Sequence, residues 1–192
     1  MQALVYNGPW DMALQELPDP VAGRGEVLLR IDAVGICGSD VHGFTGESGR
    51  RTPGMVMGHE AVGTVIALGE GVDTLHVDDR VAIYIIDYCG QCDQCLAGSE
   101  QICIRSRVLG VNAGTWGAMA PLLACPAKCL FKFDKNADPA IALLTEPLGI
   151  ATHAVNLVDP APDTTVTIVG SGMIGLALTI VLKQRGIKTV HV

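Results

Sequence analysis

The strongest constraint on this chain is a run of four cysteines in the segment CGQCDQCLAGSEQIC. The spacing is C-x2-C-x2-C-x7-C, formed by Cys89, Cys92, Cys95 and Cys103. Four thiolates this close in sequence can surround one tetrahedral zinc ion at about 2.3 Å each, which leaves no coordination position open for a substrate. We therefore expect these cysteines to form a lobe around a structural zinc.

Two other roles fit the four cysteines less well. One is that the thiols only fill a core, and the other is that they bind an iron–sulfur cluster. Thiols that only fill a core would not lie in a segment rich in Gly, Gln and Asp. The spacing C-x2-C-x2-C also occurs in ferredoxins, but the x3-C-P that follows it there does not follow it here. Cys125 and Cys129 lie outside the run, and we expect them to be ordinary thiols.

The composition predicts a globular chain made mainly of short strands. With 192 residues, 49% of them hydrophobic, the chain can form one full domain and part of a second. The 23 glycines and the low aromatic content of 4% suit many short strands joined by tight turns. The net charge of -7 argues against nucleic acid or an anionic membrane as the main partner.

The start of the sequence does not resemble a targeting signal. The first residues, MQALVYNGPW, lack the basic and apolar regions of a secretory signal. No stretch reaches the roughly 18 uncharged apolar residues of a membrane span. We therefore expect a cytoplasmic protein without a membrane partner, in which cysteines serve as metal ligands or thiols rather than disulfides.

The pattern of apolar residues changes near residue 140. Strands bounded by Gly, Pro or Asp are expected at residues 2–6, 26–37, 60–68 and 79–86. Residues 141–158 have the length and apolar spacing of one or two helical pieces interrupted at Pro147. Because DPAPD at 159–163 resembles a linker, we expect one domain over 1–158 and another over 159–192.

A glycine fingerprint follows this linker. Gly170, Gly172 and Gly175 form G-x-G-x-x-G between the strand TTVTIVG and a helical segment that ends at Gly186, its predicted C-cap. Such glycines permit a tight turn, close approach of the backbone to a pyrophosphate, and close helix packing. With the following strand at 188–192, the pattern predicts the first βαβ unit of a Rossmann domain that binds NAD or NADP. A glycine turn without a ligand is the alternative.

The nucleotide domain is expected to be truncated. The acidic residue that holds the ribose hydroxyl is due about 20 residues after the fingerprint, where the sequence ends at Val192. A complete Rossmann domain has about six parallel strands, and this chain offers about two. The choice between NAD and NADP is therefore left open.

Four residues outside the cysteine run are candidate ligands of a second metal. They are Cys37 in GICGSDVH, His59 and Glu60 in GHE, and Glu146 in TEPLG. A set with sulfur, nitrogen and carboxylate oxygen is expected where a fourth position stays open to water or substrate. Each residue alone is weak evidence, since a cysteine in an apolar run is more often a core residue. The ordered combination is what indicates a catalytic zinc.

The motifs together resemble a known family. GICGSDVH, GHEAVGTVIALGEGV, DRVAI, CGQCDQC, TEPLG and VGSGMIG follow the order and approximate spacing of the zinc-containing medium-chain dehydrogenases. The chain looks most like the sorbitol and threonine dehydrogenase branch, because TEPLG places Glu146 where the alcohol dehydrogenase branch has a cysteine ligand. The resemblance implies a mostly β GroES-like catalytic domain with a zinc lobe, then the first βαβ unit of a Rossmann α/β domain. It also implies two zinc ions per chain.

The resemblance implies roles for the candidate ligands. Cys37 and His59 would bind the catalytic zinc, and either Glu60 or Glu146 would complete the set, directly or through water. Asp40 would orient His59, a role that metal-bound imidazoles usually require.

The resemblance also implies the chemistry. An open zinc lowers the pKa of a bound hydroxyl, as it lowers that of water to about 7, so that hydride can leave its carbon for the nicotinamide. Ser39 and His42 match the positions of the family's proton relay. Alternatively, Ser39 only caps a helix, His42 is a solvated surface residue, and the proton passes through zinc-bound water and glutamate.

The expected function is a zinc-dependent oxidoreductase that transfers hydride from a secondary alcohol of a small, polyol-like substrate to NAD(P). Members of this family are usually homo-oligomers. Quinone-reductase-like relatives are a poorer match because they lack both zinc sites. A truncated zinc-binding fragment without turnover is the alternative.

Two positions depart from the family pattern. Asp79 replaces the glycine of the usual GDRV, which predicts a changed turn at that corner. Trp116 stands where relatives often have a glycine-rich turn, and we expect it either to line the substrate cleft or to pack in the fold.

Overall fold

A computed structural model describes all 192 residues and divides them into two compact units, Met1–Leu143 and Leu144–Val192. The division falls earlier in the chain than the boundary expected after residue 158. The reason is that helix α4 (Thr145–Val158) packs against helix α5 (Met173–Gln184) and so belongs with the glycine fingerprint.

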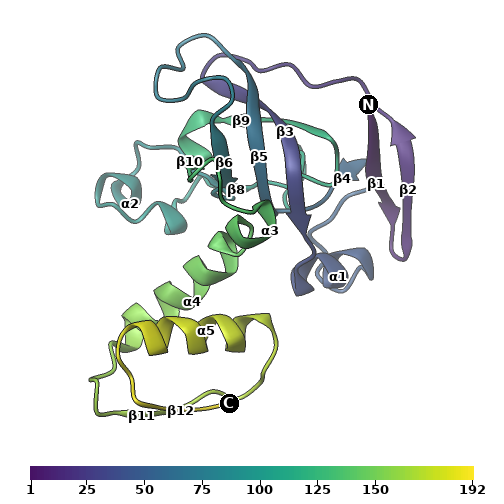
Figure 1. Cartoon of the computed structure of the whole chain (residues 1–192). Helices are drawn as coiled ribbons and strands as arrows, with labels where there is room; N and C mark the ends of the chain where they lie inside the picture. Colours follow the sequence, from purple (N-terminus) through teal and green to yellow (C-terminus); the bar gives the residue numbers. More distant parts are fainter. The chain divides into compact units, whose positions relative to one another are not determined.

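The first unit is built mainly from strands, as the composition predicts (Figure 1). Its elements are β1 (Gln2–Gly8), β2 (Asp11–Glu16), β3 (Glu26–Gly35), α1 (Gly38–Phe44), β4 (Met55–Val56), β5 (Glu60–Leu68), β6 (Arg80–Ile83), β7 (Ile86–Asp87), α2 (Asp93–Leu96), β8 (Arg107–Val108), β9 (Leu122–Pro126), β10 (Leu130–Lys132) and α3 (Pro139–Ala142), with single 3-10 turns at Glu100–Ile102 and Ala127–Cys129. The strands expected at 2–6, 26–37 and 60–68 are confirmed. The strand expected at 79–86 is instead split, because β6 pairs with β5 and β10 in the central sheet whereas β7 pairs with β8 in a separate sheet.

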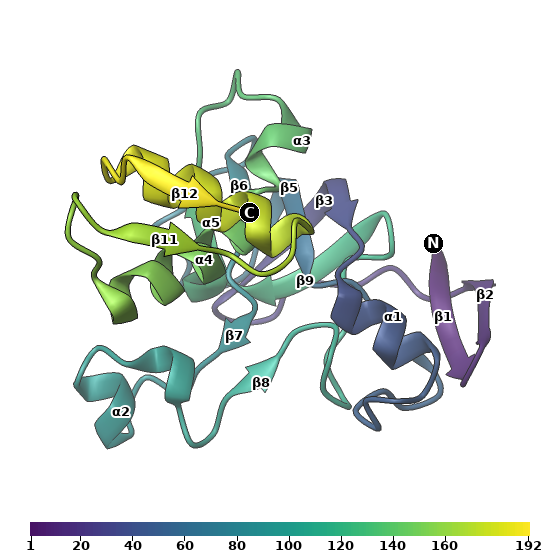
Figure 2. The same cartoon turned by 90° about the horizontal axis from the view of Figure 1, so that it is seen from below.

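Five antiparallel strands form the central sheet, in the order β10-β6-β5-β3-β9. Strands β2, β1 and β4 form a second sheet, and β7 pairs with β8. In Figure 2, β7 and β8 lead into and out of the segment that carries α2. Side chains of the central sheet form a hydrophobic core in which Val27, Leu29, Val65 and Val81 are fully buried. Burying each such side chain contributes about 1.5–3 kcal/mol.

The second unit is a βαβ motif preceded by α4. Strands β11 (Thr165–Thr167) and β12 (Thr189–His191) pair in parallel, and α5 connects them, as the fingerprint predicts. Ala151 and Val155 of α4 pack with residues of α5 in the core of this unit. Gly186 follows α5 with a φ of 85°, which confirms its predicted role at the helix end.

The interruption between the two helical pieces does not lie at Pro147. Helix α3 begins at Asp138, whose carboxylate accepts a hydrogen bond from the Ala140 amide (2.8 Å), and the break falls at residues 143–144. Pro147 lies in the first turn of α4, where amides have no partner within the helix, so its missing N–H costs nothing. The expectation of a break at Pro147 was therefore wrong.

The stretch from α3 to α4 meets the length criterion for a membrane span. By length and composition alone, the 20 residues Pro139–Val158 could cross a membrane. Buried helices of globular proteins meet the same criterion, and α4 has an apolar face packed against α5. The stretch is therefore weak evidence for a membrane segment.

The turn before β6 has an unusual residue, but it is not Asp79. Asp78 adopts a left-handed conformation with a φ of 72°, which aspartate tolerates better than most residues. The Asp79 carboxylate accepts a hydrogen bond from the His76 amide (2.8 Å) and faces Lys132 Nζ at 3.4 Å. The aspartate in the family's glycine position therefore fixes the turn with its side chain.

We predict that Gly175→Ala destabilises the second unit and Gly172→Ala does not. A Cβ at Gly175 would overlap the carbonyl oxygen of Gly170, whereas a Cβ at Gly172 would meet no atom within 4 Å. The expected loss for Gly175→Ala is about 1–3 kcal/mol, against a change within about 0.5 kcal/mol for Gly172→Ala. Amide hydrogen exchange in α5 and β12 measures the difference. Equal protection in the two variants would contradict the tight turn.

Candidate metal centres

The pairing of β3 with β5 brings Cys37 and His59 to one end of the central sheet. Gly35 at the end of β3 pairs with Glu60 at the start of β5. Because the strands are antiparallel, Cys37, just after β3, and His59, just before β5, lie side by side. The ligand atoms of Cys37, His59 and Glu60 all lie within 4.8 Å of one another. The structure thus brings together three of the four predicted ligands of the second metal.

Two glycines make room for this cluster. A Cβ on Gly35 would lie 2.5 Å from Oε2 of Glu60, so a side chain there would displace the carboxylate. Gly58 has a φ of 93°, and a Cβ on it would lie 2.8 Å from Cγ of Met119. The sharp turn that presents His59 is therefore accessible only to glycine.

A buried carboxylate orients His59. The imidazole Nδ1 lies 3.1 Å from Oδ1 of Asp40, and both side chains are almost fully buried. An ionised carboxylate only accepts hydrogen bonds, so Nδ1 carries the proton and Nε2 keeps its lone pair. This tautomer is the one that binds a metal through Nε2. The structure therefore supports the role predicted for Asp40.

Asp40 is held in its ionised form by its surroundings. Burial alone would raise the pKa of Asp40, but the hydrogen bond from His59 lowers it. The Cys37 amide (3.2 Å) and the Arg51 guanidinium (3.2 Å) also donate to the carboxylate. The net effect is a lowered pKa.

A cavity of about 420 Å³ lies against His59. It is lined by Ser39, His42, Ser48, Arg50, Arg51, His59, Ile85, Val108 and Val111. A volume of this size suits a small organic molecule. Of the three clustered ligands, His59 lies in the wall of this cavity.

The two predicted relay residues line this same cavity. Ser39 Oγ lies 3.4 Å from Nε2 of His59, and the helix N-cap is Cys37 rather than Ser39. The alternative that Ser39 only caps the helix is therefore wrong. His42 follows one turn later, with a side chain 65% exposed and its Nδ1 2.6 Å from Oε2 of Glu47. Proton transfer between the two residues stays a prediction.

The remaining predicted ligand lies in the second unit. Glu146 is in the first turn of α4 and interacts with other residues of the chain. The choice between Glu60 and Glu146 stays open, as the sequence left it.

The four cysteines of the predicted zinc lobe converge. Their sulfurs lie 3.9 Å apart for Cys89 and Cys95, 3.5 Å for Cys92 and Cys95, and 3.8 Å for Cys92 and Cys103. Four sulfurs at about 2.3 Å around a tetrahedral zinc are roughly 3.8 Å apart, whereas a disulfide needs about 2.05 Å. The cluster therefore fits a zinc ion and not a pair of disulfides.

The electrostatics of the lobe also suit a cation. The pKa of Cys89 is lowered to about 6, chiefly because the Gln91 amide donates to its sulfur. The pKa of Cys95 is raised to about 12, because removal from water and the neighbouring Cys92 oppose its ionisation. Four adjacent thiols do not all ionise by themselves, and a divalent metal would supply the missing positive charge. Cys125 and Cys129, by contrast, are buried in the apolar core, as expected for ordinary thiols.

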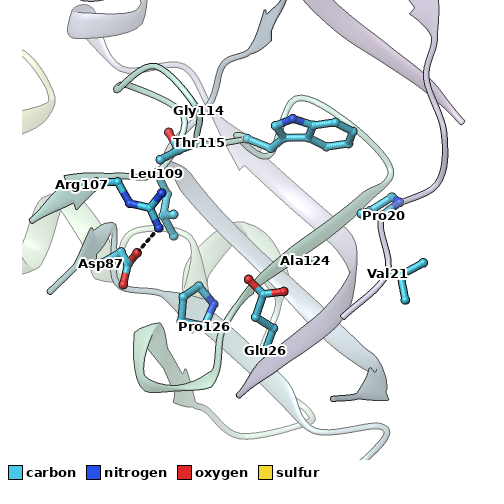
Figure 3. Close-up of a pocket in the computed structure, with 11 residues that line it drawn as sticks. Pro20, Val21, Glu26, Asp87, Arg107, Leu109, Gly114, Thr115, Ala124 and Pro126 are labelled. Carbon is cyan, nitrogen blue, oxygen red and sulfur yellow. Dashed lines mark hydrogen bonds and ion pairs between the residues drawn. The ribbon is translucent and has the colours of Figure 1, made fainter. Parts of the chain in front are cut away.

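Trp116 does not line the cavity beside His59. It lines a separate cavity of about 310 Å³ together with Glu26, the Asp87–Arg107 ion pair and residues 20–21 (Figure 3). If the cavity beside His59 is the substrate cleft, the structure does not support the role of Trp116 in lining it.

Sequence reasoning missed Arg51. Its guanidinium is buried and pairs with Asp40, although an arginine in a charged loop is usually exposed. No spacing or motif in the sequence marks it, because the partner lies on another element.

Comparisons with known proteins agree with this architecture. The alcohol dehydrogenase GroES-like domain family matches residues 23–135, more than half of the chain. The chain belongs to this family. The predicted resemblance is therefore confirmed, together with the predicted fold class of a GroES-like domain followed by the start of a Rossmann domain.

Particular relatives make the similarity more specific. L-threonine 3-dehydrogenase of Bacillus subtilis is 36% identical over 97% of the chain. A short chain alcohol dehydrogenase, RspB, of Escherichia coli, solved with NADH, is 34% identical over 99% of the chain with a TM-score of 0.92. Galactitol-1-phosphate dehydrogenase of Escherichia coli is 28% identical over 99%, also with a TM-score of 0.92. The chain spans only about half of each, at 54%, 55% and 54% of their lengths.

We predict that Cys92→Ser removes about one zinc per chain, because a hydroxyl is a poor substitute for a thiolate ligand. The control is Cys125→Ser, which disturbs a buried thiol outside the cluster and should keep the full zinc content. Elemental analysis of the reduced protein measures both. Equal zinc content in the two variants would count against the lobe as a zinc site.

We predict that Asp87 stabilises the fold in a pH-dependent way. Its carboxylate lies 2.8 Å from Arg107 and 3.0 Å from Lys128. Burial raises the pKa of Asp87, but the two cations outweigh it and the net pKa is lowered from 3.8. The stabilisation is therefore present above pH 3.8 and is lost as the pH falls through the folded-state pKa.

The test is Asp87→Asn in the metal-free chain. Because both cations are partly exposed, the expected loss near neutral pH is only about 0.5–1 kcal/mol. Urea denaturation should show this difference shrinking as the pH falls below 3.8. A difference that does not change with pH would contradict the assignment.

Proposed function

We propose that this chain supplies the metal-binding half of a zinc-dependent oxidoreductase that transfers hydride from a secondary alcohol to NAD or NADP. The observation that carries the proposal is the group formed by Cys37, His59 and Glu60 beside a cavity of substrate size. The names of the relatives support a small hydroxylated, polyol-like substrate, since they include dehydrogenases of threonine and of galactitol 1-phosphate. RspB, solved with NADH, supports the nicotinamide cofactor.

The donor set fits two zinc ions of different kinds. Four thiols without an open position would hold a structural zinc, while Cys37 and His59 would hold a catalytic one together with Glu60. When bound there, the catalytic zinc supplies a Lewis acid that lowers the pKa of the substrate hydroxyl.

The residues of the chain itself would bind and deprotonate the substrate. Ser39 Oγ, which lies 3.4 Å from Nε2 of His59, would accept the hydroxyl proton from a substrate in the cavity. His42, one turn further along α1, would take the proton from Ser39 and release it to solvent, with Glu47 stabilising the charged imidazole. Zinc-bound water and Glu60 offer the alternative route for the proton.

The glycine fingerprint would hold the cofactor. Gly170, Gly172 and Gly175 surround the N-terminus of α5, whose free amides favour a pyrophosphate. The backbone at Gly172 is open, since a Cβ there would meet no protein atom. This openness lets a phosphate approach the backbone closely.

The proposal extends to the setting of the protein. Seven free cysteines, four of them converging as ligands, favour a reducing compartment such as the cytoplasm, where the thiols are not lost to disulfides. Assembly as a homo-oligomer is proposed from the family alone.

The proposal is tested on the reduced, zinc-loaded chain by NADH binding and by galactitol-dependent or threonine-dependent reduction of NAD and NADP. We expect NADH binding, and we expect His59→Ala to abolish any turnover because it removes a ligand of the reacting zinc. Binding without turnover in the unaltered chain would favour a zinc-binding fragment. Turnover that survives His59→Ala would contradict the proposed site.

A further inference from the structure

Arg51 is a buried cation next to the candidate catalytic metal site. It lies in the segment between α1 and β4, and its side chain is only 2% exposed. The neighbouring Arg50 lines the same cavity but is exposed. The two arginines are adjacent in sequence, yet only Arg51 turns inward. That difference points to a role for the Arg51 guanidinium inside the protein.

The Arg51 guanidinium donates to the same carboxylate, that of Asp40, which receives the hydrogen bond from His59. Nη2 of Arg51 lies 3.2 Å from Oδ1 of Asp40, the same oxygen that receives Nδ1 of His59 at 3.1 Å. Longer contacts of 3.5 Å reach the carbonyls of Ser39 and Val111. Arg51 therefore connects α1, the turn after β8 and the acid that orients the imidazole.

Two features around the buried Arg51 side chain are unfavourable for stability or restrict the sequence. Nε of Arg51 is buried without a hydrogen-bond partner, which is costly for a polar atom. Helix α1 has a glycine at the point of contact, because a Cβ on Gly43 would lie 2.8 Å from Cγ and 2.9 Å from Nε of Arg51. An apolar side chain of similar size would fill the same space without an unpaired polar atom. The site therefore depends on the positive charge of the guanidinium and on its several N–H donors.

We propose that Arg51 is a positioning residue for the metal ligand His59. By pairing with Asp40, it fixes the carboxylate in the one orientation that receives Nδ1, and the lone pair of Nε2 then stays aimed at the metal. Without Arg51, Asp40 would be a buried charge with one donor fewer, held only by the Cys37 amide and by His59 itself. The inference rests on the proposed zinc site, but it does not require turnover.

The test compares metal affinity at the two sites of the 192-residue chain, using zinc and a competing chelator. In Arg51→Met, we expect the Cys37–His59 site to lose about 10–100-fold in affinity, the usual cost of removing a partner behind a metal ligand. The four-cysteine site should keep its affinity. The matched control is Arg50→Met, which removes the adjacent exposed cation and should leave both affinities unchanged.

Two further variants separate positioning from folding. Arg51→Lys keeps the positive charge but loses the planar guanidinium with its several donors. We therefore expect its metal affinity to lie between those of the unaltered chain and Arg51→Met. Gly43→Ala keeps the arginine but pushes it aside, and it should reproduce the selective loss. With cobalt at the Cys37–His59 site, the visible absorption bands should shift in Arg51→Met and Gly43→Ala but not in Arg50→Met.

Each outcome supports or overturns the inference. Unchanged affinity in Arg51→Met would overturn it, and so would an equal loss at both sites, which would indicate a purely structural role. If Arg51→Met does not fold, the metal affinities of Arg51→Lys and Gly43→Ala at the two sites test the inference by the same comparison. Failure of the unaltered chain to bind a metal at Cys37 and His59 would instead contradict the proposed function itself.

Discussion

The antiparallel register of β3 and β5 is the constraint on which the candidate catalytic site depends. With Gly35 opposite Glu60, the residues beyond the two strand ends meet, and these residues are Cys37 and His59. A slip of one residue would turn Glu60 to the other face of the sheet and separate the two ligands. The register is fixed far from the site, by buried side chains in the sheet core. The metal site is thus a consequence of how the sheet packs.

Features encoded locally could be predicted from the sequence. The spacing of the four cysteines limits them to one short lobe, and their sulfurs converge as expected. The fingerprint from Gly170 to Gly175 lies between an apolar strand and an apolar helix, and the structure forms the βαβ unit there. Glycine, proline and acidic residues bound the longer strands, so β1, β3 and β5 were located correctly, whereas the short strands β4, β8 and β10 were not. In each case, the information lies within about 15 residues of the feature.

Features that depend on distant packing could not be predicted. Helix α4 joins the second unit because its apolar face fits α5, and nothing within 141–158 indicates which partner it will have. The buried ion pair of Arg51 with Asp40 joins two segments that both look solvent-exposed in sequence. Trp116 lines a different cavity from the one that His59 lines, and no local pattern in the sequence specifies which of the two it joins.

We infer that the chain has two preformed zinc sites with different ligands, one of four cysteines and one that contains Cys37 and His59. Zinc X-ray absorption on the purified, reduced chain, combined with elemental analysis, tests it most directly. We expect two zinc ions per chain and an averaged ligand shell of sulfur at about 2.3 Å together with nitrogen or oxygen at about 2.0–2.1 Å. One zinc with a shell of sulfur alone would contradict the catalytic site, and less than one zinc would contradict both.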